Sequence, residues 1–88
     1  MKKELETFIV KNKLKFTIGR RNSDSVIIIG YALHLGFTDV DEIFEILCKK
    51  RKKAVHFKIE FLKIFNYAKK RSYGKYWLTD DAKSKYIF

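Results

Sequence analysis

Fourteen aromatic side chains in 88 residues dictate that this chain folds around a hydrophobic core. A chain of this length buries only about 60% of its unfolded surface, so a core of small side chains would be marginal. The eight Phe, five Tyr and one Trp supply large buried areas, and no proline or Gly/Ser-rich linker interrupts the sequence. The sequence therefore predicts a single domain spanning residues 1–88, with no disulfide or metal needed to hold it together.

Residues that could support catalysis or bind a metal are few and scattered. Cys48 is the one cysteine, so no intramolecular disulfide can form, and His34 and His56 add too few ligands for a structural zinc site. Asp80 and Asp81 lie where a helix N-terminus favours acids for structural reasons. The glycine motifs of nucleotide-binding proteins and the common hydrolase motifs are missing from the sequence. We expect no catalytic residues, no cofactor and no metal, and hence a protein that is not an enzyme.

No segment has the length and hydrophobicity of a targeting or membrane sequence. Residues 1–8 contain no apolar stretch of the kind found in secretory signals. The longest apolar run, residues 26–37, is interrupted by His34 and is far shorter than the roughly 20 residues that a spanning helix needs. We therefore expect an intracellular, cytoplasmic protein, in a nucleoid or a host-cell cytoplasm, with no membrane partner.

The first third of the chain permits two assignments. Apolar residues have helical spacing over 4–12, whereas apolar and polar residues alternate over 14–18 in the manner of a short strand. A helix over about 25–35 follows, which Ser23 or Ser25 could cap. The β-branched residues at the start of that helix leave a hairpin with the preceding strand open as the alternative.

Two longer helices are predicted in the middle of the chain. Gly36 is placed to end the helix before it, and Thr38 is placed to cap a helix over 39–50. Residues 54–71 predict the longest helix, which is apolar over more than half of its circumference and should therefore be central. Its narrow solvent stripe consists of His56, Lys63 and Lys70.

The last part of the chain predicts two short elements. Gly74 should end the long helical segment, and residues 75–78 could form a short strand. Thr79 is a good cap for a terminal turn that leads to Phe88.

Basic residues outnumber acidic ones by twenty to ten, and the excess is confined to one part of the sequence. Residues 49–75 contain eleven bases and one acid, whereas the remainder of the chain is neutral. A localised patch suits a phosphate backbone, because each phosphate that a Lys or Arg neutralises releases counterions. The predicted nucleic-acid-binding residues are two clusters flanking the longest helix, one lysine within it and two arginines in an earlier turn: Lys49, Lys50, Arg51, Lys52, Lys53, Lys63, Lys69, Lys70, Arg71, Arg20 and Arg21.

Three aromatic residues, Tyr73, Tyr76 and Trp77, follow the second of these clusters. They could stack on unpaired bases, which is the single-stranded or RNA form of the nucleic-acid hypothesis. Aromatic residues in so short a chain are more often part of the core, and a basic run is often a solvated loop.

Residues 31–50 read YALHLGFTDVDEIFEILCKK, with a small residue, Leu-Gly-Phe-Thr-Asp at the turn, apolar positions on the second helix and lysines at its end. This block resembles the helix-turn-helix of AraC-type transcription regulators. The resemblance implies a DNA-binding regulator in which Gly36 forms the turn and Ala32 allows the helices to cross closely. The predicted fold class is mainly α, with a possible short β-hairpin or wing. It would be a small helix-turn-helix or winged-helix-like domain in which residues 75–78 supply the wing strand.

The second helix of this block has an acidic outer face. Asp41, Glu42 and Glu45 occupy positions where contacts with base edges and phosphates favour Arg, Lys, Asn and Gln, so we do not expect this helix in a major groove. The Leu-Gly-Phe turn is also similar to that of ubiquitin-associated three-helix modules, which bind proteins.

The sequence therefore predicts a small basic protein that regulates transcription or replication by binding nucleic acid, DNA more readily than RNA. A viral or plasmid-type accessory protein is a compatible setting. The alternative is a non-enzymatic interaction or inhibitor protein that binds an acidic protein surface, for example that of a nucleic-acid enzyme. Proteins that read duplex DNA often pair, which favours a homodimer, although the sequence shows no heptad repeat to enforce one.

Overall fold

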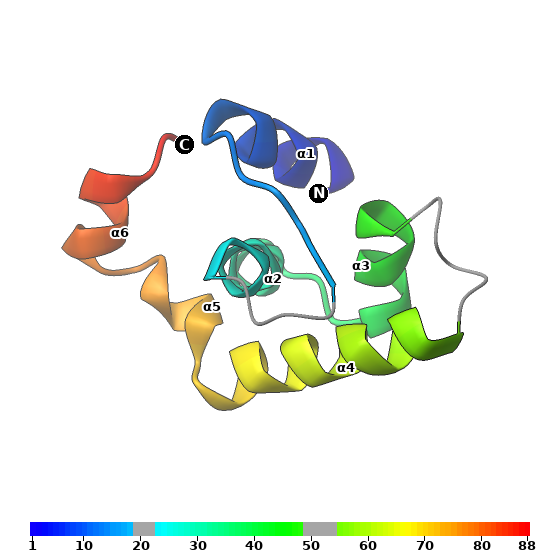
Figure 1. Cartoon of the computed structure of the whole chain (residues 1–88). Helices are drawn as coiled ribbons and strands as arrows, with labels where there is room; N and C mark the ends of the chain where they lie inside the picture. The colour runs from blue at the N-terminus through cyan, green and yellow to red at the C-terminus, as the bar shows by residue number, and fades with distance from the viewer. Residues whose placement is uncertain (19–22, 49–54) are drawn as a thin grey trace.

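The structure is a computed structural model that describes residues 1–18, 23–48 and 55–88. Its helices (Figure 1) are α1 (Lys2–Lys11), α2 (Ser23–Leu35), α3 (Val40–Leu47), α4 (Val55–Lys70), α5 (Tyr73–Tyr76) and α6 (Asp80–Lys85). No strand occurs within the described ranges. The predicted mainly α fold is confirmed, and the first four helices match the predicted ones to within a few residues. None of the described helices combines the length and the hydrophobicity needed to span a membrane.

Helix α2, rather than α4, is the centre of the domain. Ile28, Ile29 and Ala32 are fully buried, and α1, α4 and α5 all pack against this helix (Figure 1). The prediction of a central α4 was wrong because part of its wide apolar surface faces solvent. Val55 is 75% exposed and Ile59 is 50% exposed. α4 buries one face only, whereas α2 buries most of its residues between Ser25 and Ala32.

The segment predicted as a strand is extended, but it pairs with no other strand in the described chain. It leads from α1 past α2 (Figure 1). The ring of Phe16 lies 5.7 Å from that of Phe61 in α4, measured between ring centroids. Thr17 donates its backbone N–H to Ser25 Oγ at 3.0 Å, and that hydroxyl donates to the Thr17 carbonyl at 2.9 Å. Ser25, one of the two predicted caps, therefore does not cap α2, because its side chain replaces a neighbouring strand as the partner of this segment. The side chain of Ser23, the other predicted cap, lies outside the described part of the chain.

The hairpin alternative is also wrong, because the β-branched residues 26–29 belong to α2. Val26, Ile28 and Ile29 are buried there, and Ile27 packs against the core from a partly buried position. Burial on all sides outweighs the weak preference of β-branched residues for strands.

The turn between α2 and α3 has the geometry expected of a glycine. Gly36 has a φ of +110°, which favours a residue without a side chain. The N–H of Phe37 donates to the Ala32 carbonyl at 3.1 Å, closing the end of α2. The cap of α3 is Asp39, whose carboxylate accepts from the Asp41 N–H at 2.9 Å, and the prediction of Thr38 was one residue too early.

Residues 75–78 form no strand, so the predicted wing is wrong. Gly74 does not end a helix but lies within α5, against α2. A Cβ on Gly30 would lie 2.8 Å from Tyr73 Cβ, and one on Gly74 would lie 3.2 Å from Leu33 Cβ. The two glycines thus let the backbones of α2 and α5 approach closely.

An aromatic cluster joins the two ends of the chain. The rings of Phe8 and Tyr31 stack at 3.8 Å between centroids, and Trp77 meets each of them edge-on at 5.1 Å. Trp77 also contacts the rings of Tyr86 and Phe88. The fold therefore uses its aromatic residues as core, and the C-terminal segment lies beside α1 (Figure 1).

The predicted cap at Thr79 is confirmed. Its hydroxyl accepts a hydrogen bond from the Ala82 N–H at 3.3 Å and opens α6. Asp80 and Asp81 then occupy the first turn of that helix, where its dipole favours negative charge.

Candidate nucleic-acid interface

Four exposed cations lie at the end of α4 and in α5. We call this set the basic cluster, and its members are Lys69, Lys70, Arg71 and Lys75. The sequence from residue 61 to residue 79 contains these four residues and Lys63, but no Asp or Glu. The cluster therefore presents positive charge without acidic residues from its own segment to offset it.

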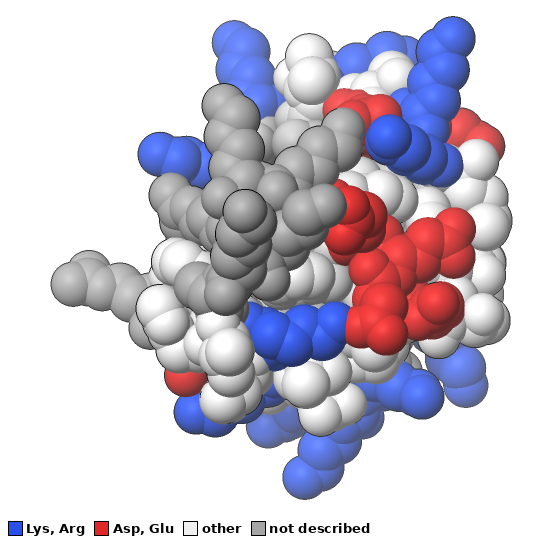
Figure 2. Space-filling model, turned by 90° about the vertical axis from the view of Figure 1, so that its right-hand side faces the viewer, with Lys and Arg blue, Asp and Glu red and all other residues white. Residues whose placement is uncertain are grey.

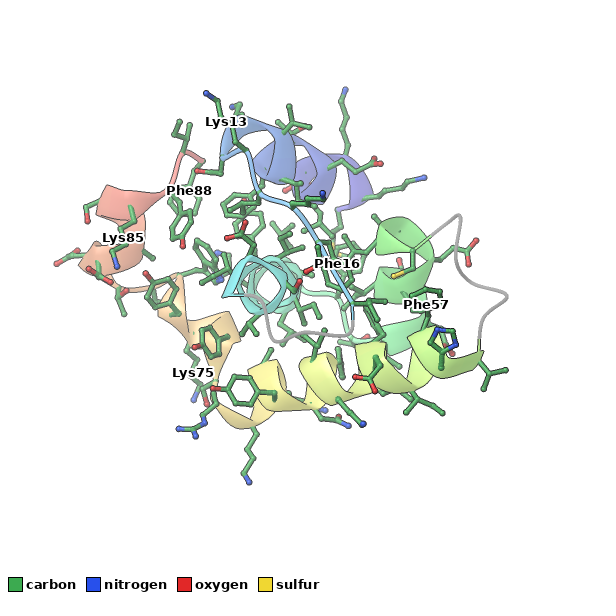
Figure 3. The ribbon with its side chains drawn as sticks, viewed as in Figure 1. Lys13, Phe16, Phe57, Lys75, Lys85 and Phe88 are labelled. Carbon is green, nitrogen blue, oxygen red and sulfur yellow. The ribbon has the colours of Figure 1, made fainter. Side chains whose placement is uncertain are left out.

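The chain turns sharply after α4, between Lys70 and Lys75 of the basic cluster. The Arg71 N–H donates to the Tyr67 carbonyl at 3.0 Å, and Ser72 has a left-handed φ of +57°. The chain then enters α5, which packs against α4 and carries Lys75 (Figure 3). Lysines in the last turn of α4 are also favoured by its helix dipole.

Arg71 is held beside an aromatic ring. Its guanidinium carbon lies 5.5 Å from the centroid of the Tyr67 ring, within the range of a cation–π contact. Such a contact orients the planar guanidinium group, which suits bidentate hydrogen bonding to a phosphate.

Lys63 extends the cationic surface along α4. It lies seven residues before Lys70, so the two share one face of the helix. Lys63 pairs with Glu60 at 3.1 Å, but its side chain is 68% exposed and such surface pairs are weak. His56, the third residue of the predicted stripe, is exposed as well.

The other predicted basic residues fall outside the described residues. These are Lys49, Lys50, Arg51, Lys52 and Lys53, which precede α4 in the sequence, and Arg20 and Arg21, which precede α2. Their part in binding remains a prediction from the sequence.

The three predicted stacking residues differ in exposure. Trp77 is only 2% exposed, so the prediction that it stacks on a base was wrong, because the ring is enclosed by the aromatic cluster. Tyr73 and Tyr76 are half-buried, and their role stays a prediction. The Tyr76 hydroxyl donates to the Asp81 carboxylate at 3.1 Å, and burial, followed by this bond, raises its pKa.

The far side of the molecule is acidic. We call the carboxylates of Asp39, Asp41, Glu42 and Glu45 the acidic face; all four are exposed, at the start of α3 and along it. Acidic side chains gather on the side of the molecule that carries α3 (Figure 2), away from the end of α4 that carries the basic cluster.

Lys58 belongs to this acidic side, although the sequence count included it in the basic region. It forms an ion pair with Asp41, and its ammonium lies 4.6 Å from the centroid of the Phe44 ring. The sequence analysis missed this pairing because partners 17 residues apart leave no local signal.

The residues weighed for catalysis or metal binding do not converge. Cys48 is the buried C-cap of α3, and His34 is exposed at the last turn of α2. The described ranges contain no group of three His, Cys, Asp or Glu side chains that could hold a metal ion.

Helix α2, the turn at Gly36 and α3 follow one another as a helix, a turn and a helix, and the outer positions of α3 are acidic, as the sequence predicts. In comparisons with known proteins, no family model, no curated protein and no solved structure matches this chain.

Proposed function

We propose that this protein binds the phosphate backbone of nucleic acid, duplex DNA in preference to RNA, through the basic cluster and Lys63. The observation that supports this function is the run of five exposed cations without an acid between residues 61 and 79. Each contact with a phosphate releases counterions and adds affinity that does not depend on base sequence. The protein acts as a regulator inside the cell, without catalysis.

The acidic face supports one orientation on the polymer. Carboxylates repel phosphates, so the side of the molecule that carries α3 points away from the nucleic acid. In that orientation α3 does not serve as a recognition helix, and binding has little dependence on sequence. The tract Lys49–Lys53 stays a candidate from the sequence alone, and a variant of its own tests it.

A salt titration tests this proposal. Fluorescence anisotropy would follow labelled duplex DNA, single-stranded DNA and RNA between about 50 and about 200 mM salt. We expect duplex DNA to bind most tightly, with a log–log salt slope that decreases in magnitude by about 0.9 for every phosphate contact removed. No binding to any of the three polymers at the lowest salt concentration would overturn the proposal.

Matched charge variants locate the contacts. The test variant replaces the basic cluster, Lys69, Lys70, Arg71 and Lys75, with Gln. The control variant replaces four exposed lysines elsewhere with Gln: Lys2, Lys13, Lys15 and Lys83. Both variants lose four positive charges. A larger loss of affinity in the test variant would therefore show that the basic cluster, and not the total charge, makes the contacts. A third variant, with Gln at Lys49, Lys50, Lys52 and Lys53, tests the other predicted tract.

An acidic protein surface is the second candidate partner. Leu78 is 68% exposed, and its N–H donates to the Lys75 carbonyl, so an exposed apolar residue follows the basic cluster closely in the chain. Protein interfaces need such an apolar anchor, whereas phosphate contacts do not. If Leu78→Ala leaves nucleic-acid affinity unchanged and weakens binding of an acidic protein, the protein partner is favoured.

A further inference from the structure

A cavity of about 450 Å³ lies between α1 and the C-terminal segment, away from the basic cluster. Phe8 and Tyr31 contribute to its floor, and Phe88, which is 52% exposed, contributes one wall. Figure 3 shows Phe88 between α6 and α1. A cavity of this size and mainly apolar lining falls within the range that holds small organic ligands.

Basic side chains outnumber acidic ones at this cavity by two to one. Lys3, Thr7 and Lys11 are spaced four residues apart and form one stripe of α1 along the opening. Neither lysine forms an ion pair with another described residue. Glu4 also lines the cavity and pairs with the N-terminal amine at 3.3 Å, so the lining holds one acid beside the two lysines.

We infer that this cavity is a binding site for a small amphipathic anion, with an apolar body and a carboxylate or phosphate head. The apolar body fits against Phe88 and the Thr7 methyl group, and the anionic head fits at Lys3 or Lys11. The methylene groups of the two lysine side chains add apolar contacts with the body of the ligand. This site uses none of the residues of the basic cluster, so it is independent of the proposed function.

Trp77 provides a reporter for this site. It is the single tryptophan of the chain, and its ring centroid lies 5.1 Å from those of Phe8 and Tyr31 and 5.8 Å from that of Phe88. Its indole N–H is buried without a hydrogen-bond partner in the described structure. A ligand that displaces or reorients these three rings therefore changes the indole N–H resonance.

The experiment is an NMR titration of the whole chain with octanoate and, separately, with phenyl phosphate, which distinguish an aliphatic from an aromatic body. We expect saturable shifts of the Trp77 indole signal and of the amides of residues 3–11 with at least one probe. The neutral counterpart octanol should bind at least about fivefold more weakly than octanoate. Tetramethylammonium tests the opposite charge preference.

Two double variants test the role of the lysines. Lys3→Gln with Lys11→Gln should weaken binding of the anion by about fivefold or more, whereas Lys2→Gln with Lys13→Gln should not change it. All four lysines are exposed, and circular dichroism checks that both variants keep the fold. No saturable shift with either anion, equal affinity for octanol, or binding of tetramethylammonium alone would overturn the inference.

Discussion

The side-chain amide of Asn12 forms two hydrogen bonds with the backbone of Ile87. Asn12 Nδ2 donates to the Ile87 carbonyl at 2.9 Å, and the Ile87 N–H donates to Asn12 Oδ1 at 2.7 Å. The same Nδ2 donates to the Phe8 carbonyl at the end of α1 at 2.9 Å. One side chain thus ties the C-terminal segment to α1 and keeps Phe88 at the edge of the cavity beside α1.

Replacing this amide should loosen the C-terminal segment. Asn12→Ala removes both bonds to Ile87, and we expect it to lower the free energy of unfolding by about 0.5–1.5 kcal/mol, because the bonds are exposed. Urea denaturation measures this change, and hydrogen exchange should show faster exchange of the amide of Ile87. The exposed Asn66 of α4 offers a control, and a loss of stability in Asn66→Ala as large as in Asn12→Ala would contradict this account.

The contact between α2 and α5 should not tolerate a methyl group at Gly30. In Gly30→Ala the new Cβ would lie 2.8 Å from Tyr73 Cβ and 3.1 Å from the Tyr73 carbonyl oxygen, so the helices must separate. We expect a loss of about 1–3 kcal/mol, measured by thermal or urea denaturation, as for other overpacked cores. Gly74→Ala meets its nearest atom at 3.2 Å and should cost less. The reverse order would show that α5 is not held where the structure places it.

Stability should fall at alkaline pH because of Tyr31. Burial, and then the nearby Glu4 carboxylate, raise the pKa of Tyr31 above its ordinary value of 10.0. The unfolded chain therefore ionises first, so this stabilisation is complete below about pH 10 and is lost as the pH rises through the folded pKa. Urea midpoints measured between about pH 9 and about pH 11 should fall more steeply for the native chain than for Tyr31→Phe. The variant keeps every lysine, so the titration of lysines affects both proteins equally. Parallel curves would contradict the prediction.

Neutralising the acidic face should strengthen binding to nucleic acid. Glu42→Gln with Glu45→Gln removes repulsion of the phosphate backbone, so we expect duplex affinity to rise by about two- to fivefold at low salt. Anisotropy with two unrelated duplex sequences measures this, and the gain should be equal for both. A loss of affinity for one sequence would mean that α3 contacts bases after all.

The elements that could be predicted from the sequence are those whose signal is local. The spacing of apolar residues marks α1–α4, Gly36 marks the end of α2, and Thr79 marks the start of α6. The strand over 14–18 was wrong because its partner is the hydroxyl of Ser25, and a side chain supplied by a helix leaves no strand pattern. The prediction of a strand over 75–78 was wrong because this segment begins within α5, which packs against α2 with Gly74 close to Leu33.

The candidate interface was predicted in part. Counting charges along the sequence picked out Lys69, Lys70 and Arg71, and all three are exposed. Their exposure could be expected because burying an unpaired charge is costly. Burial of Trp77 could not be predicted from its neighbours in sequence, since Phe8 and Tyr31 enclose it from far along the chain. The cavity beside α1 could not be predicted for the same reason, because α1 and the C-terminal segment meet only in the folded chain.

We propose that the basic cluster, and not α3, faces the nucleic acid. An NMR titration of the labelled protein with a short DNA duplex tests it most directly. We expect the largest shifts at the amides of residues 69–75, smaller ones around Lys63, and none at the outward positions of α3. Shifts concentrated in α3, with residues 69–75 unchanged, would contradict the account.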